Sequence, residues 1–103
     1  WKLRQAGRLG SAPIFLDSPM AINASRLLCD HLADHRLPAE TCHGACGIAT
    51  YIREVEESKR ITASRFPKVV ISASGMATGG RVLHHLAAFA PNRENTILFA
   101  GYQ

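Results

Sequence analysis

Apolar and polar positions alternate along the chain in a pattern that predicts short strands separated by amphipathic helices. Residues 13–16 form a compact apolar run, and residues 68–72 form a second one that is rich in β-branched side chains. The first run is typical of a strand buried on both faces of a parallel sheet, and the second, with Val69, Val70 and Ile71 at its centre, is the clearest strand pattern in the chain. Further strands are expected near residues 49–52 and over residues 95–100.

Helices are expected where the apolar residues recur at helical spacing. The clearest helix begins at Pro19, because Asp17 and Ser18 before it provide a cap and proline is compatible with a first helical turn. It is expected to run to about His35 and to bury one apolar stripe, composed of Met20, Ala24, Leu27, Leu28, His31 and Leu32. The other expected helices cover residues 1–9, 39–47, 54–64 and 80–90.

Strands that alternate with helices at these lengths predict an α/β domain with a parallel sheet. We expect a three-layer arrangement, similar to Rossmann or flavodoxin folds, with about four strands and helices on both faces. Right-handed crossovers place the carboxyl ends of all strands along one rim, where open sheets bind ligands. That rim is expected to collect three polar or glycine-rich turns, at residues 17–20, 72–80 and 101–102.

Composition and charge exclude only a few classes of protein. A chain of 103 residues with 47% hydrophobic and 19% charged residues has room for one folded domain. No apolar run approaches the roughly 20 residues of a membrane helix, and no signal peptide is evident, so we expect a cytoplasmic protein without a membrane partner. The net charge of +4 suits a polyanionic partner but does not identify one.

Three cysteines are an odd number, which argues against the disulfide framework of a secreted protein. The short spacing of Cys42, His43 and Cys46 is compatible with metal binding, but no second ligand pair is present to complete a tetrahedral site. Cys42 and Cys46 lie four residues apart in an expected helix. We therefore expect both to be small buried apolar side chains, with no metal bound.

Both ends of the chain differ from those of a typical domain. It begins at Trp1 within a helical pattern and ends on residues 96–103, an apolar strand pattern with nothing after it. Natural domains usually end in polar, poorly ordered residues. We therefore expect residues 1–103 to be a single partial domain, truncated at both ends.

Residues 72–81 join a buried strand to a helix and contain the best candidate site. Glycines permit positive φ and a close approach of a ligand, and the N–H groups of a helix start favour an anion. Gly75 to Arg81 reads G-x-x-x-x-G-R, but Val82 stands where a P-loop has the hydroxyl that coordinates magnesium. Two interpretations stay open: a phosphate-binding turn without nucleotide hydrolysis, and a structural turn that binds nothing.

Three other polar residues near this turn have simpler explanations than catalysis. His84 and His85 are adjacent, so their side chains diverge by about 100° on a helix and cannot chelate one metal together. We interpret them as surface or interdomain histidines that can contact phosphate. Asp17 has no histidine or carboxylate partner nearby in sequence, so capping is the favoured role. No catalytic residue and no metal ligand is assigned.

Four segments resemble motifs of the β-CASP domain found in metallo-β-lactamase-fold RNA-processing nucleases. Residues 15–21 resemble its LDSPLA turn, residues 55–59 match VEESK, and residues 74–86 match SGMxxGGRxLHHL. Residues 95–103 match NTxLFxGYQ. The segments occur in the family's order across nearly the whole chain. The resemblance is strongest to bacterial members, relatives of the cleavage-and-polyadenylation endonuclease and of ribonuclease J.

The resemblance implies a zinc-dependent RNA nuclease in which the β-CASP domain forms a clamp over the RNA. Two zinc ions would activate the attacking water, held mainly by a His-x-His-x-Asp-His motif that this sequence lacks. The fragment is therefore expected to be inactive and without cofactor, with RNA and the metallo-β-lactamase domain of its parent chain as partners. The residues expected to face RNA phosphates are Ser18, Ser74, Gly75, Met76, Gly79, Gly80 and Arg81.

Two other classes of function are weaker alternatives. The chain could be a free-standing small α/β module that binds RNA or a phosphorylated ligand, or a self-sufficient enzyme that uses Asp17 and the histidines. A His-x-His-x-Asp-His motif upstream of Trp1 in the parent protein would favour the nuclease over the free-standing module. An open sheet edge also permits pairing with a second copy, so a homodimer is compatible with the sequence.

Overall fold

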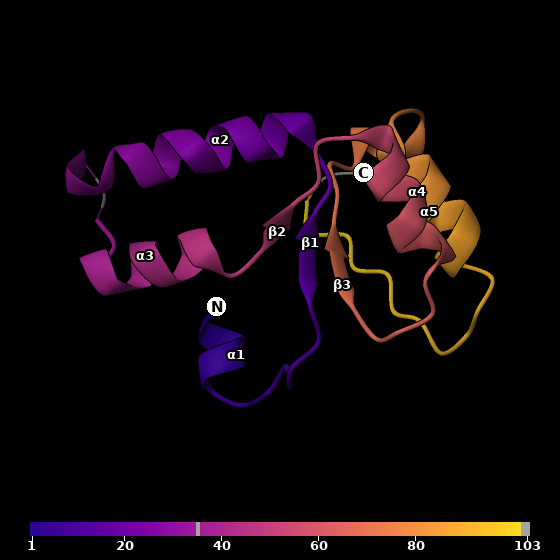
Figure 1. The fold of residues 1–103 in the computed structure, drawn as a ribbon, viewed down its shortest axis with the longest axis horizontal. Helices are drawn as coiled ribbons and strands as arrows, with labels where there is room; N and C mark the ends of the chain where they lie inside the picture. Colours follow the sequence, from indigo (N-terminus) through magenta and orange to yellow (C-terminus); the bar gives the residue numbers. More distant parts are fainter. Residues whose placement is uncertain (35, 102–103) are drawn as a thin grey trace.

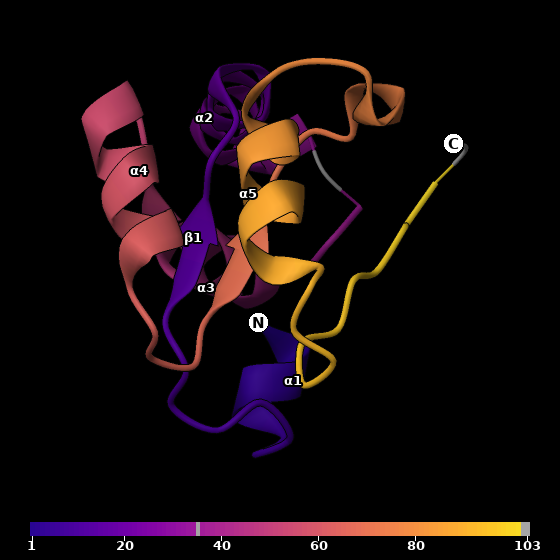
Figure 2. The same cartoon turned by 90° about the vertical axis from the view of Figure 1, so that its right-hand side faces the viewer.

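A small parallel sheet forms the centre of the protein, and helices lie on both of its faces (Figures 1 and 2). The computed structural model describes residues 1–34 and 36–101. Strand β1 (Ile14–Leu16) lies between β2 (Thr50–Tyr51) and β3 (Val69–Ile71), in the order β2-β1-β3. Both pairings are parallel, and Leu16 lies opposite Tyr51 and Ile71.

Two pairs of helices cover the two faces of this sheet. Helices α2 (Pro19–Asp30) and α3 (Ala39–Gly47) pack together on one side, and α4 (Val55–Ala63) and α5 (Arg81–Phe89) pack together on the other. The expected α/β class and its three layers are therefore confirmed. The remaining short elements are α1 (Lys2–Gln5) and the 3-10 turns η1 (Leu32–Asp34) and η2 (Gly75–Ala77).

Helices α2 and α4 begin where local capping chemistry places their starts. The Ser18 hydroxyl accepts a hydrogen bond from the Ala21 amide at 3.2 Å, and Pro19 occupies the first turn of α2. At α4, Glu54 and Glu57 form a capping box in which each carboxylate accepts from the other residue's backbone N–H. These bonds satisfy amides that have no partner within the helix.

The apolar core is small and lies around β1. Its buried apolar side chains come from β1, from the residue after β2 and from one position each in α2, α3 and α4. They are Ile14, Leu16, Ile22, Cys42, Ile52 and Ile61. No helix within residues 1–34 and 36–101 is long and apolar enough to cross a membrane.

The expected fourth strand is wrong. Residues 95–100 form neither helix nor strand, and Ile97, Leu98 and Phe99 are exposed. Strand formation by an apolar segment depends on packing against neighbours, more than on an intrinsic backbone preference. The described part of the chain therefore contains three strands instead of about four.

Helix α2 exposes most of the stripe that was expected to be buried. Met20 is 77% exposed and Leu27 is 63% exposed, whereas Ile22 is only 2% exposed. The helix touches the sheet mainly at its start and then runs outward alongside α3 (Figure 1). The expected helix to about His35 also ends earlier, at Asp30, and His35 lies outside the described residues.

The expectation for the cysteines holds for one residue and fails for another. Cys42 is buried, as expected, at 1% exposure. Cys46 forms a disulfide with Cys29, with their Cα atoms 6.1 Å apart. The antiparallel packing of α2 against α3 brings the two residues together, and an odd number of cysteines does not exclude one such pair.

Candidate functional site

Two loops meet at the carboxyl ends of β1 and β3 and enclose an open hollow of about 420 Å³. Residues 17–20 form one wall, and residues 72–73 and 79–81 form the other. Two of the three turns expected at this rim are thus brought together. Gly101, from the third turn, does not line the hollow, and Tyr102 lies outside the described residues.

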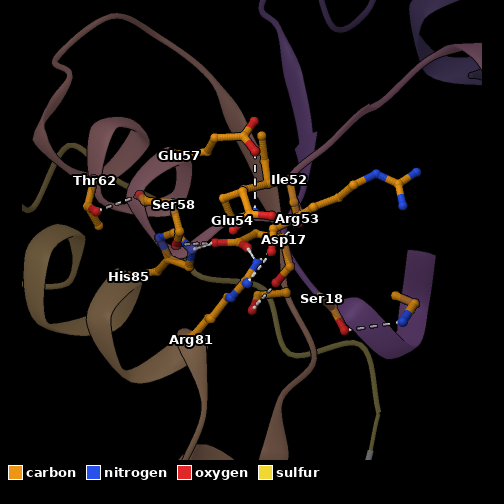
Figure 3. A network of polar contacts seen from close by, with 12 residues as sticks. Asp17, Ser18, Ile52, Arg53, Glu54, Glu57, Ser58, Thr62, Arg81 and His85 are labelled. Atoms are coloured by element: carbon orange, nitrogen blue, oxygen red, sulfur yellow. Dashed lines mark hydrogen bonds and ion pairs between the residues drawn. The ribbon is translucent and has the colours of Figure 1, made fainter. Parts of the chain in front are cut away.

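A buried carboxylate fixes the wall of this hollow. Asp17 follows β1 directly, and its side chain is 0% exposed. It accepts hydrogen bonds from the Ser58 hydroxyl of α4, from Arg81 Nη1 at 2.6 Å and from His85 Nε2 at 2.7 Å (Figure 3). One side chain therefore connects the end of β1 to both helices of the α4/α5 layer. We call Asp17, Ser58, Arg81 and His85 the Asp17 cluster.

The Asp17 carboxylate is ionised at neutral pH. Burial alone raises the pKa of Asp17, but the hydrogen bonds from Ser58, Arg81 and His85 outweigh this effect, so the pKa lies below its ordinary value of 3.8. An ionised carboxylate can only accept hydrogen bonds. The His85 nitrogen that faces it, Nε2, must therefore carry a hydrogen. The other ring nitrogen, Nδ1, is buried without a hydrogen-bond partner in the described part of the chain.

Arg81 is the first residue of α5, and its guanidinium forms three hydrogen bonds to other groups of the protein. Its Nη1 donates to Asp17 and to the Ile52 carbonyl at 3.1 Å, and its Nη2 donates to the Arg53 carbonyl at 2.6 Å. The guanidinium also lines the hollow. Its charge is compensated by Asp17, so Arg81 presents N–H groups to the hollow more than net positive charge.

The glycine-rich turn has a strained backbone. Gly80, directly before α5, has a φ of 79°, which a glycine adopts at no steric cost. Met76 and Ala77 also have positive φ values, 51° and 55°, although neither is a glycine. Such conformations cost free energy and persist where the surrounding structure enforces them, often at binding sites. A hydrogen bond from the Ala77 amide to the Ser74 carbonyl at 2.7 Å helps to hold the turn.

The expected phosphate-contacting residues fall into two groups. Ser18, Gly79, Gly80 and Arg81 line the hollow. The others, Ser74, Gly75 and Met76, lie earlier in the same turn, where Met76 is exposed.

Residues 1–103, the whole chain, match the model of the Beta-Casp domain. The chain belongs to the β-CASP family. The resemblance drawn from the four sequence motifs is therefore confirmed.

Known relatives of this β-CASP chain include two kinds of protein. Ribonuclease TTHA0252 of Thermus thermophilus is 35% identical over an alignment 103 positions long, which covers 93% of this chain and 24% of that protein. Transcription termination factor FttA of Methanocaldococcus jannaschii is 36% identical over 52 residues, which cover 50% of this chain and 8% of that protein. The chain thus spans about a quarter of the length of the ribonuclease.

Two expectations for individual residues need correction in this β-CASP chain. The cap of α2 is Ser18, while Asp17 is the centre of the buried cluster. His85 is 6% exposed and bonds to Asp17, so it is not a surface residue, whereas His84 is exposed. The partners of Asp17 lie 41, 64 and 68 residues away in sequence, so a search among sequence neighbours could not find them.

The Asp17 cluster does not have the geometry of a catalytic triad. In a triad, the base accepts the proton of the nucleophilic hydroxyl and the carboxylate orients that base. Here the hydroxyl of Ser58 donates directly to Asp17, and His85 donates to the same carboxylate. Nothing in this arrangement activates Ser58, so the cluster is suited to holding elements in place.

Zinc does not fit the described residues of this β-CASP chain. Within residues 1–34 and 36–101, no three histidine, cysteine or acidic side chains are grouped so as to hold a metal ion. Cys29 and Cys46 are bonded to each other. No step of a reaction is therefore assigned to these residues.

Proposed function

We propose that this β-CASP chain supplies RNA-binding surface to a zinc-dependent RNA-processing nuclease, as part of a clamp over the RNA. The observation that carries the proposal is the hollow at the carboxyl rim of the sheet, with a strained glycine turn as one wall. A ribonuclease and transcription termination factors among its relatives support a role in RNA processing. Catalysis and the two zinc ions would belong to a metallo-β-lactamase domain of the same parent chain.

The chemistry of the walls suits a phosphate group. Gly79 and Gly80 have no side chain between the backbone and the hollow, so a ligand can approach the chain closely. The Ser18 hydroxyl accepts the capping bond from Ala21 and keeps its own hydrogen for donation. Ser74, Gly75 and Met76 would extend the same surface along the RNA backbone. Contacts of this kind position RNA without reading its sequence.

A single charge placed in the hollow tests this proposal. An added Cβ at Gly79 meets nothing within 4 Å and its φ is ordinary, so Gly79→Asp should preserve the fold. In the complete protein, repulsion from RNA phosphates should weaken binding roughly tenfold, or about 1.4 kcal/mol, by a similar factor for different RNA sequences. Fluorescence anisotropy with labelled single-stranded RNA at fixed salt measures the change.

Gly47→Asp is the matched control. Gly47 ends α3, lies outside the walls of the hollow and also has open space around an added Cβ. The Gly47→Asp substitution adds the same charge elsewhere on the molecule and should leave the RNA affinity within twofold of that of the unmodified protein. Equal affinities for Gly79→Asp, Gly47→Asp and the unmodified protein would show that RNA does not bind at this rim.

A further inference from the structure

We propose that Arg53 supplies the positive charge that attracts RNA phosphate to this rim, and that Arg81 is a positioning residue that holds Arg53 there. The inference rests on the proposed RNA-binding function and names a residue that the sequence motifs do not single out. It follows from the charges in the hollow and from the place where β2 ends.

The walls of the hollow carry no uncompensated positive charge of their own. Arg81 is the only cationic residue among the lining residues described, and its guanidinium is 2.6 Å from the buried Asp17 carboxylate. A ligand that is farther from the pair than the two charges are from each other therefore experiences almost no net electrostatic attraction from them. A polyanion binds through cations that neutralise its phosphates, so a further cation has to act at this rim.

Arg53 does not line the hollow but lies at the same rim of the sheet, because it follows β2 and β2 runs alongside β1. The Ile52 amide donates to the Leu16 carbonyl at 3.0 Å, which extends the pairing of β2 with β1 as far as the rim. Neighbouring strands are about 4.8 Å apart. The backbone of Arg53 is therefore close to Asp17 and Ser18, which belong to the wall of the hollow.

The side chain of Arg53 is exposed and points away from the Asp17 cluster (Figure 3). Ile52 is buried whereas Arg53, the next residue, is exposed, so the two side chains lie in different surroundings. Within residues 1–34 and 36–101, the Arg53 guanidinium has no hydrogen-bond or ion-pair partner. Its charge is thus available to a ligand.

Two acidic residues follow Arg53, but both are directed elsewhere. The Glu54 carboxylate accepts a hydrogen bond from the backbone of Glu57, and Glu57 Oε1 accepts from the Glu54 amide at 3.3 Å. This capping box turns both carboxylates towards the start of α4. Neither one forms an ion pair with Arg53 in the described chain, so they lower the positive potential around it only by Coulomb interaction at a distance, which salt weakens.

Arg81 fixes the segment that carries Arg53. Its planar guanidinium reaches Asp17 and the carbonyls of Ile52 and Arg53 at the same time. A lysine has the same charge, but it lacks the fork geometry that allows these simultaneous bonds. The end of β2 would therefore be less well held in an Arg81→Lys variant, although the charge at position 81 is unchanged.

Salt dependence of RNA binding tests the role of Arg53 in the complete protein. The probe is a single-stranded oligouridylate, titrated by fluorescence anisotropy at several salt concentrations. Loss of one phosphate contact should flatten the slope of log K against log salt by about 0.7 for a single strand. Arg53→Gln should show this change, whereas Arg65→Gln should not. Arg65 is also exposed but lies between α4 and β3, at the opposite edge of the sheet.

A double-mutant cycle tests the positioning role of Arg81. Arg81→Lys should weaken oligouridylate binding severalfold when Arg53 is present, and should have little further effect in the Arg53→Gln background. If Arg81 contributes independently of Arg53, Arg81→Lys should weaken binding by the same factor whether position 53 is arginine or glutamine. That additive result would overturn the positioning role. An unchanged salt slope for Arg53→Gln would overturn the role of Arg53. If Gly79→Asp still weakens binding, only this inference fails; if it also has no effect, the proposed function fails.

Discussion

The two helical layers of this protein are attached to the sheet by different chemistry. On the α4/α5 side, a buried carboxylate receives three hydrogen bonds from side chains of both helices. On the α2/α3 side, the buried side chains are the apolar Ile22 and Cys42, and a disulfide joins the two helices to each other. A hollow of about 180 Å³ with mostly apolar lining remains on that side, and Leu27 and Met20 are exposed.

This difference indicates which helical layer determines the geometry of the candidate site. Hydrogen bonds to an ionised group are directional, so the Asp17 cluster fixes where α5 begins and where the glycine turn ends. The disulfide restricts the chain chiefly in the unfolded state and does not touch the rim. We therefore expect the geometry of the hollow to depend on the α4/α5 layer and to be nearly independent of the Cys29–Cys46 bond.

The largest expected effect comes from removing the charge of Asp17. Asp17→Asn keeps the size of the side chain but leaves the part-buried guanidinium of Arg81 without its buried counter-charge. Breaking a buried ion pair in this way typically costs about 3–5 kcal/mol. Urea unfolding should therefore show a much lower midpoint, and oligouridylate binding by the folded protein should weaken because Arg81 loses its anchor.

Asp30→Asn provides the control for that variant. It removes one carboxylate from the exposed end of α2, on the other side of the sheet, and should change the free energy of unfolding by less than about 0.5 kcal/mol. Similar unfolding midpoints for Asp17→Asn and Asp30→Asn would mean that the Asp17 cluster contributes little to stability.

An intermediate effect is expected from the disulfide. The Cys29→Ser/Cys46→Ser double variant should lose about 3 kcal/mol of stability, as estimated for closure of a loop of about 15 residues; the two cysteines are 17 residues apart. Its oligouridylate affinity should match that of the oxidised protein. Urea unfolding with and without a thiol reductant makes the comparison, because reductant should shift only the protein that contains both cysteines. A loss of RNA affinity on reduction would contradict the independence of the rim from this layer.

A change of pH tests the same charge without a mutation, and its effect near neutral pH is the smallest because Asp17 is already ionised there. Because the pKa of Asp17 is lower in the folded protein than the ordinary 3.8, its ionisation stabilises the fold above that pH. This stabilisation is lost as the pH falls below 3.8 and passes through the folded pKa. Unfolding midpoints measured from neutral to acidic pH should therefore converge for the unmodified protein and Asp17→Asn. Curves that stay parallel in acid would show that Asp17 does not carry this dependence.

Sequence reasoning located most elements because their signals are local. A short apolar run predicted β1, a β-branched run predicted β3, and the capping residues before Pro19 placed the start of α2. The glycine turn was found for the same reason, since glycines mark backbone conformations that other residues adopt at a cost. Residues 95–100 show the limit of this approach, because an apolar run becomes a strand only when a neighbouring strand is available.

The candidate site was predicted only in part. Residues 17–20 and 72–81 were expected to meet at the rim, because parallel strands place their carboxyl ends together. Arg53 was missed, since an isolated arginine after a short strand carries no motif. The role in binding that we propose for it rests on geometry, namely its exposure and its contact with Arg81.

The sequence by itself determined the family, the alternation of strands and helices and the rim at which a ligand would bind. These follow from local periodicity and from motifs in register. Only the tertiary structure decided that Asp17 is a buried ion, that His85 is its partner, that Cys29 bonds to Cys46 and that Arg81 is neutralised. Each of these depends on groups far apart in sequence, and only folding reveals whether their distance and burial allow them to interact.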